Sequence, residues 1–586
     1  MNPATLPRLL RTVRHLHPSQ VLWRLRLLAE RRFSSPRPVD PDPAQVEAAL
    51  SASELPAVPL FHRSATEGPT ILEQLRAGRF VHLRREVELG RERPDWLLGP
   101  VASERLWAIT LHYHEWAYAL AEVAAGKGRE ADEAESLLVH YLTDWIRRAD
   151  VRSPGARDLA WNSFAIATRL GWWARLRSRM QGRRRGAWRD FERLFARSFW
   201  QQADWLERHL EWDLRGNHLL RDLVGLGWAG RLFSGPRAAR WTAVAETIVG
   251  EQLAEQLLPD GSHFELSPTY HIHVMEDLYA LALLLRQSDT VELLRAALAR
   301  MAGYLAWMRH PDGRVPLFND GGMHALCEPA RMLRLCRELG LPHEPERPVG
   351  GRRFVDAGMI VWHGDPWSIF FDVGRVGADC VPGHGHADTL SLECSWRGRR
   401  LIVDPGSYAY DDDARRRYDR STAAHNTVCI DGQDSSEVWH IFRVGRRAAP
   451  LDVSARFAGD GFEAAAAHDG YRGLAGRPRH ERRLSVDRSG RLTIVDALEG
   501  GGRQAASGGL LLDPAWGVER TDGGWLVRCG AERLRVAVSG RGARLRLETG
   551  EATYHPDYGV EVTTRRLTWR CHDAFPYEVR TEIEAA

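Results

Sequence analysis

The segment GLPHEPERPVGG, residues 340–351, separates two parts of the sequence that have different hydrophobic periodicities. Its prolines and glycines are typical of a connection between elements. Before it, apolar residues recur at helical spacing, and after it they alternate with polar residues as they do in strands. The segment therefore predicts a junction between an all-helical region and an all-β region.

On the helical side, the pattern is clearest in residues 131–150, ADEAESLLVHYLTDWIRRAD. Apolar side chains three and four positions apart form one face of a helix, here Leu137, Leu138, Tyr141, Leu142, Trp145 and Ile146. Similar runs recur before residue 340, and two Pro-Asp-Gly turns, at 259–261 and 311–313, stand between such runs. This pattern indicates an array of antiparallel helix pairs.

Beyond residue 350, short alternating runs such as SIFFDV, LSLECSW and RLTIVDALEG are separated by Gly, Asp and Asn. No helical pattern separates them, so we expect an antiparallel β-sandwich. The predicted fold is α+β and multidomain. It has a basic helical extension over residues 1–60, a helical domain over 61–345 and a β-sandwich over 346–586.

The composition excludes some classes of function. The 586-residue chain is 44% hydrophobic, and 80 Lys+Arg against 77 Asp+Glu give a formal net charge of +3. This balance gives no general attraction to nucleic acid or to a membrane surface. No apolar run approaches the length of a transmembrane helix, and the Arg-rich N-terminus lacks the apolar core of a signal peptide. We therefore expect a cytoplasmic protein, with the periplasm as the alternative.

Four polar clusters carry candidate chemistry. They are EWDLRGNHLL with Asn217 and His218, HFELSPTYHIH with Tyr270 and His271, VPGHGHADTL with His384 and His386, and DPGSYAYDDDARRRYDRSTAAHN with Asp404, Arg420 and His425. Each admits a purely structural interpretation, because Asn, Ser and Pro favour helix starts and glycine-flanked histidines can belong to a polar loop.

In an extended segment, His384, His386 and Asp388 would share one side. Imidazole nitrogen and carboxylate oxygen suit zinc, so these residues predict a metal site, an acid/base site or both. The H-x-H-x-D-H motif of metallo-β-lactamase-like hydrolases is not completed, because position 389 is Thr. Tyr270 would act as a base only where nearby cations favour its phenolate.

Taken in order, RGNHLL, DGSHFELSPTYH, GHGHAD, DPGSY and AHNTVCIDG resemble the heparinase II/III-like polysaccharide lyases, over roughly residues 100–450. The resemblance implies an incomplete (α/α) toroid of helical hairpins joined to an antiparallel β domain. It also implies β-elimination of an acidic polysaccharide that contains uronic acid. The N-terminus resembles members encoded beside bacterial exopolysaccharide or capsule enzymes, which implies such a glycan as the substrate.

By this resemblance, Asn217 neutralises the substrate carboxylate, Tyr270 acts as base and acid, and His384 is the alternative base. A structural zinc ion would be held by His386, Asp404 and His425, with Asp388 in support. Substrate contacts are expected from His218, His271 and Arg420.

Two other functions stay open on the sequence. A glycoside hydrolase would need two carboxylates at a suitable separation, and Glu265 is one candidate without an evident second. A glycan-binding or assembly protein without catalysis is the other alternative. The oligomeric state is left open, with a homodimer as one option.

Overall fold

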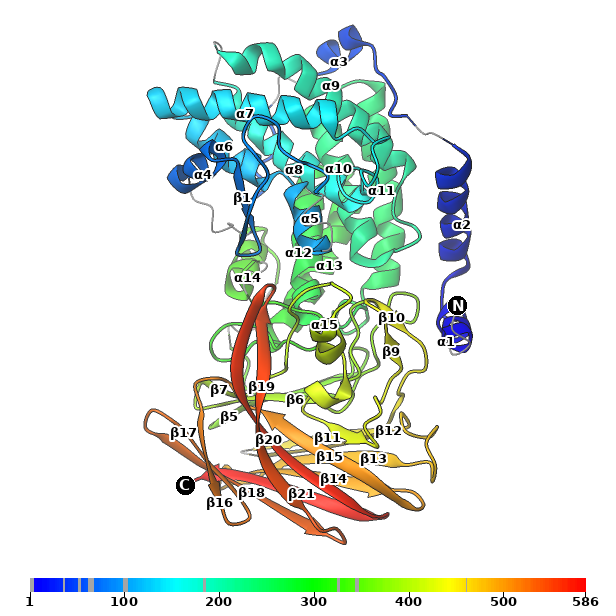
Figure 1. Cartoon of the computed structure of the whole chain (residues 1–586), viewed down its shortest axis with the longest axis vertical. Coiled ribbons are helices and arrows are strands. Elements are labelled where there is room, and N and C mark those ends of the chain that lie inside the picture. The colour runs from blue at the N-terminus through cyan, green and yellow to red at the C-terminus, as the bar shows by residue number, and fades with distance from the viewer. Residues whose placement is uncertain are drawn as a thin grey trace. The chain divides into compact units, whose positions relative to one another are not determined.

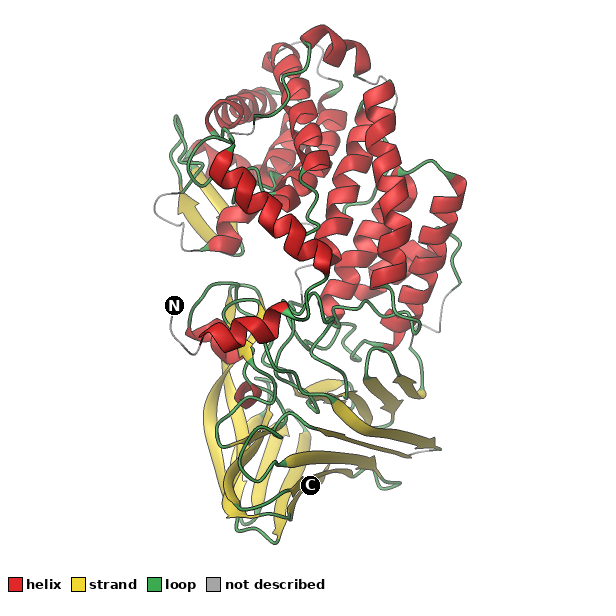
Figure 2. Ribbon diagram, turned by 90° about the vertical axis from the view of Figure 1, so that its right-hand side faces the viewer, coloured by secondary structure: helices red, strands yellow, loops and turns green. Residues whose placement is uncertain are grey.

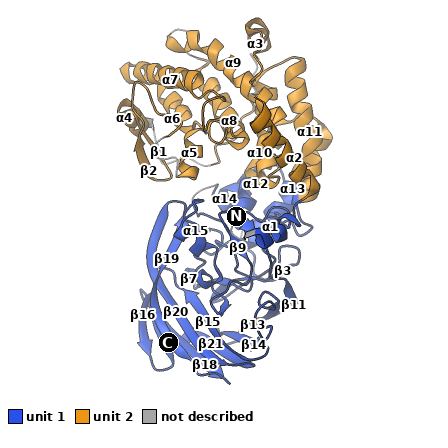
Figure 3. Ribbon diagram, turned by 45° about the vertical axis from the view of Figure 1, so that its right-hand side comes forward, with its two compact units in different colours: residues 1–16, 256–273, 297–586 blue, residues 17–255, 274–296 orange. Residues whose placement is uncertain are grey.

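The structure is a computed structural model, and it describes residues 5–34, 37–50, 54–61, 68–98, 104–182, 186–323, 327–342, 347–459 and 461–586. The chain forms two compact units (Figure 3): unit 1 comprises residues 1–16, 256–273 and 297–586, and unit 2 comprises residues 17–255 and 274–296. The predicted boundary between residues 345 and 346 lies outside the described residues. The three-part division of the chain stays a prediction.

Helices dominate the first part of the chain, as predicted (Figure 1). They are α1 (Thr5–Val13), α2 (Pro18–Phe33), α3 (Pro43–Ala49), α4 (Gly68–Arg76), α5 (Arg105–Leu111), α6 (Glu115–Ala124), α7 (Arg129–Arg148), α8 (Ser163–Met180), α9 (Ala187–Arg208), α10 (Gly216–Leu232), α11 (Pro236–Gln256), α12 (Pro268–Leu284), α13 (Ser288–Trp307) and α14 (Pro329–Glu338). A short hairpin joins β1 (Arg79–His82) to β2 (Arg85–Glu88). No helix among the described residues combines the length and apolar character needed to cross a membrane.

Local sequence signals account for where several helices begin. On α7, the predicted apolar face is buried from Leu137 to Trp145, while acidic residues in the first turn and arginines in the last complement the helix dipole. At α12, Pro268 occupies the first turn, and the Ser267 hydroxyl accepts a hydrogen bond from the Tyr270 amide. The expected helix start in SPTY is therefore confirmed. The toroidal closure of the helices stays a prediction.

The strands of the second part are β3 (Gly350–Phe354), β4 (Met359–Gly364), β5 (Trp367–Asp372), β6 (Leu392–Trp396), β7 (Arg399–Ile402), β8 (Val428–Ile430), β9 (Val438–Trp439), β10 (Arg443–Val444), β11 (Pro450–Ala458), β12 (Gly461–His468), β13 (Arg479–Val486), β14 (Leu492–Glu499), β15 (Arg503–Leu511), β16 (Gly517–Thr521), β17 (Gly524–Cys529), β18 (Glu532–Arg541), β19 (Arg546–Asp557), β20 (Val560–Ala574) and β21 (Tyr577–Ala585). Their pairing is antiparallel. The predicted order, a helical region followed by an antiparallel β region, is confirmed.

These strands form three larger sheets (Figure 2). Their orders are β3-β4-β5-β6-β7, β11-β12-β13-β14-β21-β18-β17-β16 and β19-β20-β15-β8, and a further two-stranded sheet pairs β9 with β10. One hydrophobic core draws on all three, with Ile369 of β5, Leu484 of β13 and Leu510 of β15 among its members. The alternating pattern thus buries one face of each sheet against another sheet.

One element of the β region was not predicted. A six-residue helix, α15 (Ala414–Asp419), and a 3-10 turn at Thr422–Ala424 lie between β7 and β8. The Asp413 carboxylate accepts a hydrogen bond from the Arg416 amide and so caps α15. The run of three arginines at 415–417 lies within this helix, and Arg416 is buried.

Candidate active site

Polar residues from distant parts of the sequence meet in unit 1, on the segments between its strands and helices. Tyr270 lies at the start of α12, His384 and His386 lie between β5 and β6, and Asp320 lies between α13 and α14. The tip of the β19–β20 hairpin, residues 555–559, adds Tyr558 to this group. Connections between regular elements bring these side chains together, as is common for binding and catalytic residues.

The Tyr270 and His384 rings form the centre of the site. They stack with their centroids 3.7 Å apart and their planes 24° apart. The Tyr270 hydroxyl lies 2.7 Å from that of Tyr410, which lies 2.6 Å from that of Tyr558. The structure thus joins two predicted catalytic residues and links one of them to two further phenols.

The Asp320 carboxylate contacts several side chains of the site and holds them together. Its carboxylate lies 2.9 Å from His384 Nδ1 and 3.0 Å from His386 Nε2. It also forms an ion pair with the Arg416 guanidinium, whose second nitrogen lies 2.9 Å away, and accepts a hydrogen bond from the Ser407 hydroxyl at 3.1 Å. Because both histidines donate to Asp320, His384 Nε2 and His386 Nδ1 are left as the basic nitrogens.

Burial and charge set the protonation of the central groups. Burial acts to raise the pKa of Asp320, but Arg416 and the two histidines outweigh it and hold that pKa well below its usual range. The pKa of Tyr270 is raised well above its ordinary value, by burial first and then by Tyr558 and Asp320. The condition for Tyr270 to act as a base, nearby cations that favour its phenolate, is therefore not met by these surroundings, which favour the neutral phenol.

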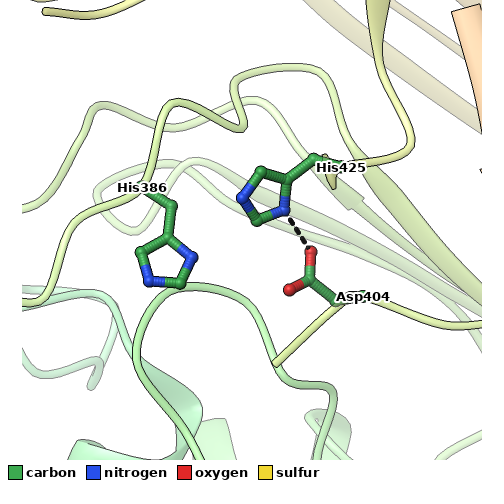
Figure 4. A group of neighbouring side chains, drawn as sticks. All are labelled: His386, Asp404 and His425. Carbon is green, nitrogen blue, oxygen red and sulfur yellow. Dashed lines mark hydrogen bonds and ion pairs between the residues drawn. The ribbon is translucent and has the colours of Figure 1, made fainter. Parts of the chain in front are cut away.

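The three predicted metal ligands also lie together (Figure 4). His386, Asp404 and His425 are fully buried, and each offers a ligand atom within 4.8 Å of the others. His425 Nδ1 lies 2.8 Å from Asp404 Oδ2, so that His425 Nε2 carries the free lone pair.

The chemistry of this donor set fits a divalent cation. Among the described residues, His386 Nδ1 and His425 Nε2 are buried without a hydrogen-bond partner, although such atoms are nearly always satisfied. Burial raises the pKa of Asp404 well above its usual value and that of Asp388 to about 6, and neither Arg566 near Asp404 nor His425 near Asp388 offsets it. Two imidazoles and a carboxylate are a ligand set that zinc accepts.

The residue that orients a predicted metal ligand differs from the one expected. Asp388 was expected to support a histidine, but its Oδ2 has no hydrogen-bond partner in the described part of the chain. Asp320 is hydrogen-bonded to His386 instead, and a carboxylate partner of this kind fixes the tautomer of a histidine that ligates a metal.

Two residues expected to contact substrate lie inside the protein. The Arg420 guanidinium is buried, and it donates hydrogen bonds to the backbone carbonyls of Gly385, His440 and Ile441. His271 is also buried, its Nε2 lies 3.0 Å from the Met301 carbonyl, and burial lowers its pKa to about 4. Arg420 thus supports the backbone between His384 and His386, and His271 contacts α13, so neither buried side chain has the sugar-binding position predicted for it.

Asn217 and His218 belong to unit 2, in the first turn of α10. Arg215 takes the N-cap position, so Asn217 is not the helix cap that its sequence context allowed. The Asn217 side chain is buried, whereas His218 is half-buried and its Nδ1 lies 3.1 Å from Glu211 Oε2.

Three residues of the site were missed in the sequence, namely Asp320, Tyr410 and Tyr558, whereas Arg416 lies in the arginine run of the fourth cluster but was given no role there. Asp320 had a weak signal, because it follows an apolar run and the second Pro-Asp-Gly turn and precedes two glycines. For Arg416, the sequence signal is Asp413 three residues earlier, because Asp is a residue type that favours helix starts. Tyr558 had no signal in the sequence, because its neighbours predict only a hairpin turn.

Comparisons with known proteins agree with this architecture. The chain matches the heparinase II/III N-terminus over residues 81–335 and the heparinase II/III-like C-terminal domain over residues 346–582. A heparin-sulfate lyase from Bacteroides thetaiotaomicron is 26% identical over 239 residues, which cover 39% of this chain and 33% of that protein. One from Pedobacter heparinus is 24% identical over 365 residues, covering 58% and 54%. The chain thus matches only about a third to a half of these curated relatives' length.

Solved structures with the same fold include a heparinase III. Its TM-score is 0.74 at 19% identity, with 96% of this chain and 89% of that chain covered. A chondroitin AC lyase from Streptomyces coelicolor A3 gives a TM-score of 0.53 at 12% identity, covering 97% and 83%. At these sequence identities, the similarity shows that the fold is shared. With the two matched domains in order and together spanning most of the sequence, the chain belongs to the heparinase II/III-like family.

Proposed function

We propose that this protein is a polysaccharide lyase that cleaves an acidic, uronic-acid-containing polysaccharide by β-elimination. The observation that carries the proposal is the stacked Tyr270–His384 pair, in which one ring has a basic nitrogen and the other a protonated hydroxyl. β-Elimination needs these two groups side by side, because a proton leaves C5 of the uronate while another must reach the departing O4.

His384 is the proposed base. The Asp320 carboxylate accepts a hydrogen bond from Nδ1–H, so the lone pair of the neutral ring is on Nε2, 3.4 Å from a Glu265 carboxylate oxygen. When Nε2 takes the C5 proton, the imidazolium that forms lies between two carboxylates. Both carboxylates are thus placed to accept hydrogen bonds from the N–H groups of that imidazolium.

Tyr270 is the proposed acid. Its raised pKa keeps the phenol protonated, and its hydroxyl is hydrogen-bonded to Tyr410. As the C4–O4 bond breaks, its electrons leave with O4, which takes the Tyr270 proton, and the former C5–H electrons form the C4=C5 double bond. The products are an unsaturated uronide and a new hydroxyl end.

Asn217 and zinc have supporting roles in the proposal. The Asn217 carboxamide would donate to the uronate carboxylate, where negative charge grows as C5 is deprotonated. Zinc held by His386, Asp404 and His425 would supply a fixed positive charge among buried carboxyls. It would join the segments that carry these ligands, and no step of the elimination requires it to touch the substrate.

The substrate class follows from names that relatives carry. Heparin-sulfate lyases and a chondroitin lyase are among them, and these names point to glycans that contain uronic acid. A bacterial exopolysaccharide is the narrower candidate. A hydrolase is less well supported, because Asp320 is paired with Arg416 and Glu265 lies against His384.

The test is a screen of uronic-acid polymers, including the host's own exopolysaccharide, for the ultraviolet absorbance of an unsaturated uronide. We expect Tyr270→Phe to lower kcat by about 10²–10⁴-fold, the usual contribution of a positioned acid or base. Tyr118→Phe is the matched control, because in the described part of the chain the Tyr118 hydroxyl hydrogen-bonds to the exposed side chains of Glu122 and Arg179 and lies apart from the candidate site. New reducing ends without the absorbance would identify a hydrolase and refute the proposal.

A further inference from the structure

Phe442 is an exposed aromatic ring beside the candidate catalytic pair. It is 37% exposed, and its ring centroid lies 6.5 Å from that of His384 and 5.4 Å from that of Tyr410. Single exposed apolar side chains are common on protein surfaces. This one differs because its ring lies edge-on to two rings of the site while more than a third of the residue is exposed to water.

The hairpin that carries Phe442 is fixed from inside unit 1. It runs from β9 to β10, and two buried arginines of the site hold its turn. Arg416 Nε donates to the Ile441 carbonyl at 3.1 Å, and Arg420 donates to the His440 and Ile441 carbonyls at 3.0 Å each. The Arg416 guanidinium also lies 5.6 Å from the Phe442 ring centroid. The arginine that pairs with Asp320 therefore also positions Phe442.

Helix α1 fixes the same hairpin from its other side. Arg11 forms two hydrogen bonds to the Glu437 carboxylate, at 2.6 and 2.8 Å, and Arg8 adds one at 3.2 Å. Trp439 Nε1 donates to the Thr12 hydroxyl at 3.2 Å. The ring is thus held in place before any ligand arrives, which lowers the entropy cost of binding.

We infer that Phe442 is a sugar-binding platform, on which the apolar C–H face of a pyranose ring next to the cleaved linkage packs. A pyranose presents carbon-bound hydrogens on one face, and burying that face against an aromatic ring removes apolar surface from water. Phe442 carries no charge, so it recognises the sugar ring whatever its sulfation. The inference rests on the proposed function, since it places an acidic polysaccharide at this site.

Phe442→Ala tests the platform through binding and through kinetics. In the active protein we expect KM to rise about tenfold with kcat changed less, because stacking acts on the ground state and the transition state alike. Phe442→Tyr and Phe442→Trp should restore KM. Leu451→Ala is the matched control, because it removes a side chain that is 38% exposed and lies on β11, and it should leave KM unchanged.

Binding measured in a Tyr270→Phe background separates this inference from the proposed function. Calorimetric titration with uronic-acid oligosaccharides should show about tenfold weaker binding when Phe442→Ala is added. Equal affinity with and without the Phe442 ring would overturn the platform, even if lyase activity is present. Phe442-dependent binding without any elimination product from the parent would instead overturn the lyase and retain the platform. If the parent binds none of the polymers, both proposals fail.

Discussion

Asp320 is a single buried carboxylate on which the candidate active site depends. It accepts from His384 Nδ1 and His386 Nε2 and pairs with the Arg416 guanidinium. The side chains of Asp320 and Arg416 are 0% and 2% exposed, so their charges are compensated by each other rather than by water. One residue therefore sets the tautomer of the proposed base and that of a proposed metal ligand.

We predict that Asp320→Asn destabilises the fold by about 3–5 kcal/mol, because it leaves Arg416 buried without a counter-charge. Urea unfolding of the variant and the parent measures the difference. The control is Asp158→Asn, whose partner Arg31 is 2.8 Å away but where both side chains are more than half exposed. Surface pairs contribute little, so this variant should unfold with the parent. Equal stability of Asp320→Asn and Asp158→Asn would contradict the prediction.

At the scale of elements, three connecting segments of the β region meet at the proposed metal ligands. His386 lies between β5 and β6, Asp404 follows β7, and His425 directly follows the 3-10 turn ahead of β8. These ligand positions lie outside the strands of the sheets. A bound ion would therefore act on the fold as a cross-link between them.

We predict that the purified protein contains about one equivalent of a divalent metal, with zinc expected. His425→Ala should lose the metal and unfold at a lower temperature, because a ligand that binds only the folded state stabilises it. Elemental analysis and thermal unfolding measure the two effects. His572→Ala removes an exposed histidine and should keep both properties.

The response to a chelator decides whether loss of the metal causes the lower unfolding temperature of His425→Ala. Chelation should lower the melting temperature of the parent and of His572→Ala, but leave that of His425→Ala unchanged. A metal-free parent, or a His425→Ala variant that retains the ion, would refute the ligand assignment.

At the scale of the whole molecule, several buried histidines make folding sensitive to acid. Burial lowers the pKa of His82 to about 4, that of His112 to about 3 and that of His271 to about 4. The unfolded chain binds these protons near pH 6.5, the ordinary histidine pKa. Their contribution to stability is therefore complete above that pH and is lost progressively as the pH falls toward about 4.

His82→Phe tests this linkage at a position where burial alone lowers the pKa. The ring of His82 packs edge-on against Trp107 at 5.4 Å, a contact that Phe can keep. We expect the free energy of unfolding to depend less steeply on pH between about 6 and 4.5, by up to about 1.4 kcal/mol per pH unit. His140→Gln, at an exposed position on α7, should leave the slope unchanged. An unaltered slope in His82→Phe would refute the assignment.

The sequence by itself determined the features that depend on neighbours along the chain. The change of period near residue 340 predicted the order of helical and β regions, because each period buries a different face. The Asp260 and Asp312 side chains close the two Pro-Asp-Gly turns on the amides of Ser262 and Arg314. Ser267 and Pro268 likewise start α12 as their positions predict. These are local interactions, which the residues involved fix among themselves.

Tertiary structure alone decided how the site is assembled. Asp320 meets His384 and Arg416 across 64 and 96 residues, and Tyr410 meets Tyr558 across 148. No local pattern encodes such pairs, because they depend on which loops converge after the sheets have packed. The same packing buried Arg420 and His271, which the sequence presented as substrate contacts. It also left Phe442 exposed beside His384. The Phe442 side chain has no reactive group, so the role inferred for it follows from this position.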